Sequence, residues 1–360
     1  LRGNVALVLQ LSYFIAPILL FGADRKIIKL GPNARSTHLP AATVIGALGA
    51  LATPVCYLIA GPQGLWAIPV AVVGALFAIG RAWNISFQKP MSYLLWFSTY
   101  QVTIVAQSAI LYLMGVTIWE LWLIVYILPG LALAYLHVRH IVSLGGGGFR
   151  AQRRVAVDGL QFVGGTVAHM VTTRFERIAL PVMTGSMELG LYVVVATATE
   201  PIMWFAQAIS DARVSSGSAR TTRAKAVLAD LLIFAGMAVA GGLAIFNLIV
   251  PLFGDEFAES KNLVLPLMIA AVLLALYRQF AGRILAARPP RVIALTEMVI
   301  AASAVPLYIW QISIFGSAAG AAWGSVVVYT VALIISSGVT AYIQRSDGPE
   351  SGREVGELVV

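Results

Sequence analysis

Charged residues are scarce in this chain. Asp, Glu, Lys and Arg make up 11% of its 360 residues, whereas hydrophobic residues make up 59%. A water-soluble core of this length does not need so much apolar surface, and the mean hydropathy of +0.86 is far above that of soluble domains. The composition therefore excludes a soluble globular protein and predicts an integral membrane protein.

Cysteine and histidine are also rare. The single cysteine, Cys56, lies inside an apolar run and has no second cysteine to pair with, and the four histidines are scattered. A disulfide framework and a thiolate metal site are therefore excluded, and we expect no cofactor.

Acidic residues are too few to balance the basic ones, which leaves a net charge of +8. Such a balance would suggest nucleic acid as the partner of a soluble protein. Here the Lys and Arg residues occupy short gaps between apolar runs, where cytoplasmic retention and anionic headgroups explain them. We therefore expect membrane lipids as partners and no nucleic acid.

Apolar runs long enough to cross a bilayer, about 20 residues each, recur along the chain. Eleven are predicted: Asn4 to Gly22, Pro40 to Ala60, Leu65 to Gly80, Ser92 to Gly115, Ile118 to Val138, Val155 to Thr172, Met187 to Ile209, Ala226 to Phe253, Asn262 to Leu285, Val292 to Phe315 and Ala318 to Ile343.

Lys and Arg fall almost entirely in every second gap, 19 of the 24 on one face of the membrane. The positive-inside rule makes that face cytoplasmic and places Leu1 outside. An outside start without a signal peptide suggests that one span preceding Leu1 is missing, so that the parent protein would have twelve. On the predicted outer face stand only Arg2, Arg174, Arg177 and Lys261.

The chain is expected to form two lobes. An N-terminal lobe of five spans (1–138) is joined to a C-terminal lobe of six spans (155–344) by a basic cytoplasmic linker (139–154) that contains four consecutive glycines. A polar tail (345–360) follows on the cytoplasmic side and is expected to be disordered.

Polar residues inside the spans point to a polar interior. A charge in hydrocarbon costs several kcal/mol, so Glu200 and Arg278, which are deep in their spans, should face protein or water. On the sixth and seventh spans polar residues follow one helical face. These stripes are Asp158, Gln161, Gly165, His169, Thr172 and Glu176 on the sixth, and Thr197, Glu200, Trp204, Gln207 and Asp211 on the seventh.

A structural interpretation remains open for most of these residues. The small and uncharged polar members also suit helix contacts, in which small residues allow close approach and polar groups bond across the bundle. Four carboxylates near span ends, Asp158, Asp211, Asp230 and Glu297, are also placed to meet headgroups or loop arginines. Arg283 is placed to snorkel to the cytoplasmic interface, and a buried structural histidine is a commoner role for His169 than a proton relay.

No hydrolytic motif accompanies these residues. The chain has no Gly-x-Ser-x-Gly, no His-Glu-x-x-His and no outer loop large enough for a catalytic domain. A polar interior in a two-bundle protein favours translocation, and we expect the protein not to be an enzyme.

Five short motifs occur in order along the second half of the chain: Glu176 to Leu180 (ERIAL), Leu189 to Tyr192 (LGLY), Pro251 to Phe257 (PLFGDEF), Ala286 to Arg288 (AAR) and Phe315 to Trp323 (FGSAAGAAW). Together they resemble the polysaccharide and oligosaccharide-lipid flippases of the multidrug/oligosaccharidyl-lipid/polysaccharide exporter superfamily. The resemblance covers Arg174 to Ile343 well and Leu1 to Arg139 mainly in the rhythm of spans and short loops. It implies a MATE-like fold, an all-α bundle with two lobes of six helices.

The resemblance implies a function in surface polysaccharide or lipopolysaccharide assembly in the bacterial plasma membrane. The substrate would be a polyprenyl-pyrophosphate-linked oligosaccharide, flipped to the outer leaflet by alternating access, with polysaccharide assembly proteins as further partners. Arginines pair bidentately with phosphate, so Arg278, Arg283, Arg174 and Arg177 are the expected pyrophosphate ligands. Gln161, His169 and Gln207 would line the sugar path. Glu200, Glu176 and Asp230 would exchange a coupling H⁺ or Na⁺, since burial in a low dielectric favours protonation of a carboxylate.

Two rivals remain. A MATE-type drug or metabolite antiporter would share both lobes and a carboxylate, but its substrate is usually a cation. A membrane polysaccharide polymerase or ligase would handle the same lipid-linked sugars, but it usually needs a substantial outer loop, and the longest outer gap here is short. We rank the flippase first, the antiporter second and the polymerase third.

Overall fold

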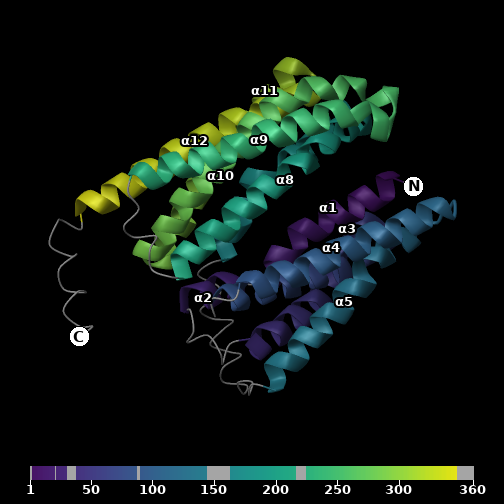
Figure 1. Ribbon diagram of the computed structural model, residues 1–360, viewed down its shortest axis with the longest axis horizontal. Helices are drawn as coiled ribbons and strands as arrows, with labels where there is room; N and C mark the ends of the chain where they lie inside the picture. The colour runs from purple at the N-terminus through teal and green to yellow at the C-terminus, as the bar shows by residue number, and fades with distance from the viewer. Residues whose placement is uncertain are drawn as a thin grey trace. The chain divides into compact units, whose positions relative to one another are not determined.

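The computed structural model describes residues 2–20, 22–30, 38–86, 90–143, 163–215 and 224–346, and all regular structure in these ranges is helical (Figure 1). The predicted all-α class is confirmed. The chain divides into two compact units, unit 1 (Leu1–Val167) and unit 2 (Ala168–Val360). The predicted linker begins within a helix that ends at Ser143, and its residues 144–154 lie outside the described ranges, as do residues 347–360 of the predicted tail.

Unit 1 contains five labelled helices. They are α1 (Arg2–Leu20), α2 (Ala23–Leu30), α3 (His38–Ser86), α4 (Pro90–Leu113) and α5 (Trp119–Ser143). The helix α2 was not predicted, because eight residues cannot cross a bilayer and its sequence ADRKIIKL is mostly polar. It packs on α3 through buried Ile27 and Ile28, and the Ser86 hydroxyl donates to the Ile27 carbonyl at 3.0 Å.

The 49-residue helix α3 is two crossings rather than one. A straight helix of that length would extend about 74 Å at 1.5 Å per residue. A Cβ atom on Gly49 would nevertheless lie 3.0 Å from a methyl group of Val72, so the two halves of α3 pack side by side. The chain reverses at Gly61, whose φ of 59° is the left-handed conformation that favours glycine. This hairpin contains the predicted second and third spans.

Unit 2 is made of longer helices. A helical stretch over residues 163–174 leads into α7 (Glu176–Thr184), and α8 (Ser186–Ser215), α9 (Ala224–Phe253), the 3₁₀ segment η3 (Asp255–Leu263), α10 (Val264–Ala287), α11 (Pro290–Phe315) and α12 (Ala318–Ser346) follow. Gly185 and Gly316, both at positive φ, end α7 and α11 and allow immediate reversals.

Eight helices within the described residues are long and apolar enough to span a membrane. Eleven spans were predicted. Of the remaining three, the first corresponds to α1, whose apolar part is short, and the second to the first half of α3. The sixth begins among residues 155–162, outside the described ranges, and continues through residues 163–174.

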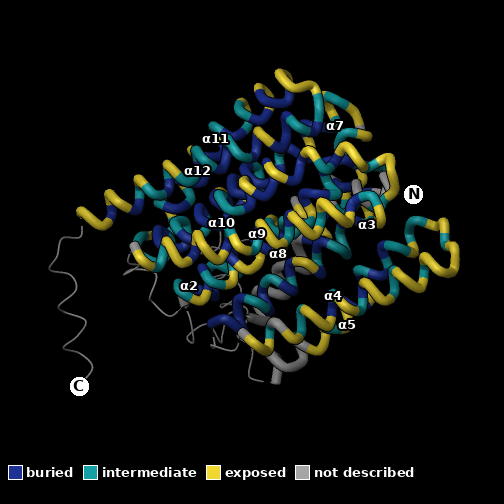
Figure 2. Tube along the Cα trace, turned by 45° about the horizontal axis from the view of Figure 1, so that its top comes forward, coloured by how far each residue is buried: buried dark blue, intermediate teal, exposed yellow. Residues whose placement is uncertain are grey.

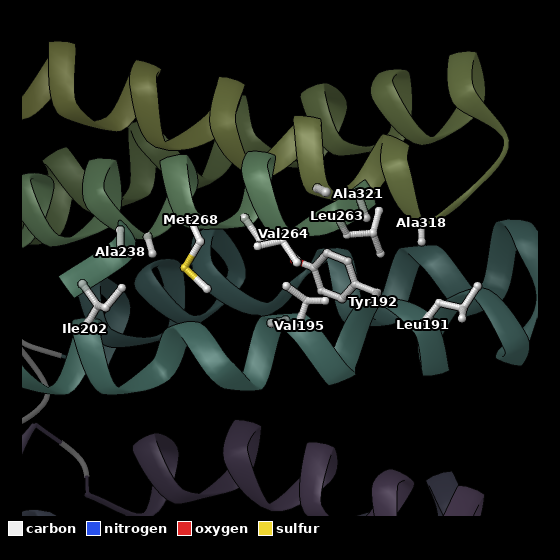
Figure 3. Packing of buried hydrophobic residues seen from close by; sticks show 14 of the residues in the cluster. Leu191, Tyr192, Val195, Ile202, Ala238, Leu263, Val264, Met268, Ala318 and Ala321 are labelled. Atoms are coloured by element: carbon white, nitrogen blue, oxygen red, sulfur yellow. The ribbon is translucent and has the colours of Figure 1, made fainter. Parts of the chain in front are cut away.

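The helix α10 is the central element of unit 2. In the span that contains it 67% of the residues are buried, against 22% in the span of α9, and Figure 2 shows the buried residues inside the bundle. Side chains of α8, α9 and α12 pack around α10. Figure 3 shows Val195 and Tyr192 of α8 beside Val264, with Met268 next to Ile202 and Ala238. This packed core holds the polar side chains described next.

Candidate functional site

Glu200 is held by two arginines in the interior of unit 2. It is the fifteenth of the 30 residues of α8, so it lies at the middle of a spanning helix, and it is 8% exposed. One carboxylate oxygen, Oε1, accepts hydrogen bonds from Arg174 Nη1 at 2.9 Å and from Arg177 Nη2 at 3.3 Å. Glu200 therefore faces protein and not lipid, as predicted.

Glu176 extends this group of charges. Its Oε1 lies 3.7 Å from Arg177 Nε and accepts a hydrogen bond from the Tyr192 hydroxyl at 3.3 Å. The same hydroxyl lies 3.3 Å from Ser325 Oγ of α12. We call Arg174, Glu176, Arg177, Tyr192, Glu200 and Ser325 the central cluster.

The central cluster lines a cavity of about 40 Å³, to which α10 contributes apolar residues. That volume holds a few water molecules, not a sugar. Glu176 Oε2 is buried and makes no hydrogen bond to any described protein group. A water molecule or a small ion in the cavity would satisfy it, whereas a larger substrate group requires the helices to move apart.

The helical stretch 163–174 continues into α7 through Phe175, which lies between Arg174 and Arg177. Phe175 has helical dihedral angles; its N–H donates to the Val171 carbonyl at 3.1 Å, and its carbonyl accepts from the Ala179 N–H at 2.9 Å. The Tyr308 hydroxyl of α11 donates to the Thr172 carbonyl at 3.2 Å. Arg174 and Arg177 are therefore held on a continuous helical backbone.

A second group of polar residues joins the ends of α8, α9 and α10 on the predicted cytoplasmic side. Arg213 holds Asp230 with two hydrogen bonds, at 2.5 and 2.8 Å, and donates to Gln279 Oε1 at 3.0 Å. In turn, Gln279 Nε2 donates to the Ala206 carbonyl at 2.7 Å. Asp230, a predicted coupling residue, is thus the bidentate partner of an arginine.

Arg278 and Arg283 belong to this second group. Arg278 Nη1 donates to Gln207 Oε1, and Gln207 Nε2 donates to Asp211 Oδ1 at 2.7 Å. Arg283 is 7% exposed and lies over the ring of Phe280 at 4.5 Å. Its Nη2 is buried and makes no hydrogen bond to any described protein group. We call this second set the cytoplasmic-end cluster; it comprises Gln207, Asp211, Arg213, Asp230, Arg278, Gln279 and Arg283.

His169 lies in neither cluster. It contacts Tyr277 of α10 and Glu297 of α11, and all three side chains are buried.

The structure thus divides the predicted site residues into separate sets. Arg174, Glu176, Arg177 and Glu200 come together, Gln207, Asp230, Arg278 and Arg283 form another set, and His169 stands in a third. Gln161 lies outside the described residues. The two arginines counted on the outer face, Arg174 and Arg177, are buried in helical structure and not in a loop.

Sequence reasoning missed several partners of these residues. Tyr192 had been noted only within a motif, Arg213 only as a loop charge, and Tyr277 and Ser325 had no assigned role. A helical period indicates which face of its own helix a residue occupies, but not which side chain of another helix meets it. Within the described residues no group of three His, Cys, Asp or Glu side chains could hold a metal ion.

The chain resembles solved transporters in structure. A variant of the MATE transporter VcmN from Vibrio cholerae superimposes with a TM-score of 0.67 at 12% identity, covering 95% of this chain and 88% of the transporter. An outward-facing multidrug resistance MATE transporter of the MOP superfamily gives 0.65 at 13% identity, with the same coverage. A MOP superfamily transporter from Pyrococcus furiosus, described as having a binding pocket of reverse polarity, gives 0.63 at 13% identity and the same coverage.

No family model matches the chain, and no curated protein matches it. At these low identities the comparisons establish the fold, which is that of the MATE transporters. The MATE-like architecture predicted from the sequence is therefore confirmed, and the chain is a multi-span membrane protein.

Proposed function

We propose that the chain is a membrane transporter that flips a polyprenyl-pyrophosphate-linked oligosaccharide by alternating access. The observation that carries the proposal is Arg283, a buried guanidinium whose Nη2 has no hydrogen-bond partner among the described protein groups. Such a group is costly in a membrane protein unless an acceptor arrives. A phosphate oxygen is the acceptor that suits guanidinium geometry best.

The position of Arg283 suits the loading of substrate from the cytoplasm. It stands one helical turn beyond Gln279, on the same face of α10. These residues lie toward the predicted cytoplasmic end of unit 2. A lipid-linked pyrophosphate made in the cytoplasm would meet them before it reached the central cluster.

The central cluster suits a later step. Arg174 and Arg177 share one carboxylate oxygen of Glu200. A pyrophosphate offers the same kind of acceptor and would compete with Glu200 for both guanidinium groups. The displaced Glu200 carboxylate, left buried without its partners, would take up a proton or Na⁺, which links substrate movement to an ion.

The decisive measurement is flipping of a polyprenyl-pyrophosphate oligosaccharide in proteoliposomes, followed by its accessibility to an added lectin. Arg283→Gln should slow flipping about 10-fold or more, because a hydrogen bond between charged groups contributes about 1.5 to 3 kcal/mol. Arg291→Gln, an exposed arginine in the first turn of α11, is the matched control and should leave the rate unchanged. Equal rates for Arg283→Gln and the control would contradict the proposal.

A second candidate, a MATE-type drug or metabolite cation antiporter, is favoured by a different observation. Among the described residues of unit 2, buried carboxylates outnumber buried arginines: the former are Glu176, Glu200, Asp211, Asp230 and Glu297, and the latter are Arg174, Arg177 and Arg283. An organic cation would seek such carboxylates. Uptake of tetraphenylphosphonium driven by a pH gradient, lost in Glu200→Gln, together with no flipping of the pyrophosphate lipid, would establish the antiporter instead.

A further inference from the structure

Three buried polar side chains from three helices meet away from both clusters. His169 comes from the stretch 163–174, Tyr277 from α10 and Glu297 from α11, and none is more than 4% exposed. His169 Nδ1 lies 3.3 Å from Glu297 Oε2 and 3.2 Å from the Tyr277 hydroxyl, whose own proton is donated to the same carboxylate oxygen. We call His169 and Glu297 the His169–Glu297 pair.

One nitrogen of the imidazole, His169 Nδ1, faces two oxygen atoms. With Glu297 as a carboxylate, Tyr277 donates its single hydroxyl proton to Glu297 Oε2, and a protonated Nδ1 can donate to either oxygen. The neutral and positively charged forms of the imidazole differ by one proton.

We propose that the His169–Glu297 pair is the site at which unit 2 binds and releases a coupling proton. The inference rests on the proposed transport function. Histidine is the side chain whose charge normally changes between about pH 5 and pH 8. A carboxylate within hydrogen-bond distance of it titrates together with it, so the pair exchanges protons as one unit. The proton comes from water and returns to water, and the charge of the pair changes by one at each transfer.

The carboxylates that were predicted to couple are bound differently. Glu200 is held by Arg174 and Arg177, and Asp230 is held by Arg213 through two hydrogen bonds. Arginine stays charged at all physiological pH values, so proton uptake at either carboxylate requires an ion pair to open first. At the His169–Glu297 pair a proton can be added to an imidazole that is already in place.

The groups that contact the pair are aromatic. Tyr277 faces it from α10, and its ring stacks on that of His169 with 5.9 Å between centroids. Tyr277 also belongs to a buried cluster with Tyr308 of α11 and Tyr329 of α12. The nearest arginines along these helices are Arg174, five residues after His169, which binds Glu200, and Arg278, next to Tyr277, which binds Gln207.

The pair shares a helical stretch with part of the central cluster. His169 precedes Arg174, which holds Glu200, by five residues. A charge gained at His169 would therefore act on that guanidinium over little more than one helical turn.

The test is an infrared titration of the full chain in lipid nanodiscs, in which protonation changes a carboxyl C=O band or an imidazole ring band. The wild-type chain should show a component with a midpoint between about pH 5 and pH 8. His169→Gln and Glu297→Gln should each abolish that same component. Glu256→Gln, an exposed glutamate of η3, and His137→Gln, a histidine of α5, should leave it unchanged.

Tyr277→Phe keeps the pair but removes a donor to the carboxylate. It should shift the midpoint of that component, because the carboxylate loses a hydrogen-bond donor. Tyr277→Phe also serves as a control for folding, because it keeps the aromatic ring that packs in the core. A component that survives Glu297→Gln or His169→Gln, or two variants that remove different components, would overturn the inference.

Flipping assays separate this inference from the proposed function. With a pH gradient, Glu297→Gln should lose the acceleration that the gradient gives to flipping by the wild-type chain. If the infrared titration behaves as expected but the wild-type chain does not flip the lipid, the proposed flippase function is refuted and the proton site is retained. Flipping that remains accelerated by the gradient in Glu297→Gln would refute the proton site and keep the flippase.

Discussion

At the scale of single residues, the central cluster is held together by charges that cannot be removed one at a time. Glu200 has two guanidinium partners and its side chain is 9% exposed. Removing one member of a buried ion pair leaves a buried charge without compensation, which typically costs about 3 to 5 kcal/mol.

Glu200→Gln should therefore lower the free energy of unfolding by about 3 to 5 kcal/mol, measured by denaturant unfolding in detergent. The double variant Glu200→Gln with Arg174→Gln should lose less than the sum of the two single variants, because only one charge then remains to be compensated. Glu256→Gln serves as the exposed control. Additive losses would show that Glu200 and Arg174 do not interact.

The same residues show what the sequence could predict of the site. Burial of Glu200 and His169 followed from their positions inside apolar runs, since an ionisable group in a span has to face protein or water. Burial of Arg174 and Arg177 did not follow, because both had been counted on the outer face. The pairing of these groups did not follow. Tyr192 and Ser325, which join Glu176 across helices, are 133 residues apart, and no local pattern encodes that contact.

At the scale of helices, close approach depends on particular glycines. Gly282 of α10 lies against Ser210 of α8, and a Cβ atom there would overlap the serine hydroxyl while remaining 3.5 Å from its Cβ.

Gly282→Ala should destabilise unit 2 by about 1 to 3 kcal/mol through this overlap, measured by thermal unfolding in detergent. Adding Ser210→Ala removes the overlapping atom and should restore most of the loss, since alanine favours a helix over glycine by about 1 kcal/mol. If Ser210→Ala gives no recovery, the α8–α10 contact is not the cause.

Gly320 of α12 presents a different case. A Cβ atom there would lie 2.7 Å from the Gln311 carbonyl oxygen and 2.8 Å from Ile312 Cα, both backbone atoms of α11. Gly320→Ala should therefore lower the thermal stability, and no side-chain replacement on α11 should restore it. A Cβ atom on Gly338 of the same helix would meet nothing within 4 Å. Gly338→Ala should therefore be neutral or mildly stabilising. Equal stability of the two variants would argue against the close backbone contact.

The helices also show what hydropathy can and cannot predict. Long apolar runs with basic gaps predicted α4, α5 and α8 to α12 with small errors at their ends, because backbone groups in lipid have to be satisfied within each helix. The amphipathic α2 was missed, because half of its residues are charged and it is too short to cross a bilayer.

At the scale of the whole molecule, the orientation in the membrane rests on charge alone and is open to direct measurement. In a Cys56→Ala background, a cysteine replacing Glu256 of η3 should react with a membrane-impermeant maleimide added outside intact cells. One replacing Arg345 near the end of α12 should react only after permeabilisation. Both residues are exposed. Reaction of the Arg345→Cys variant in intact cells would reverse the assigned orientation.

Glu188, in the first turn of α8, accepts a hydrogen bond from the backbone N–H of Ala318 at 2.6 Å, at the first residue of α12. A carboxylate at a helix N-terminus is favourable there, because it meets unsatisfied N–H groups and the positive end of the dipole. Spin labels at Met187 and Trp323, both exposed, would then report one sharp separation in every state of the cycle. Glu188→Gln should broaden the distribution of distances between the two labels. In the wild-type chain this pair of positions would provide a constant reference distance for measuring larger movements.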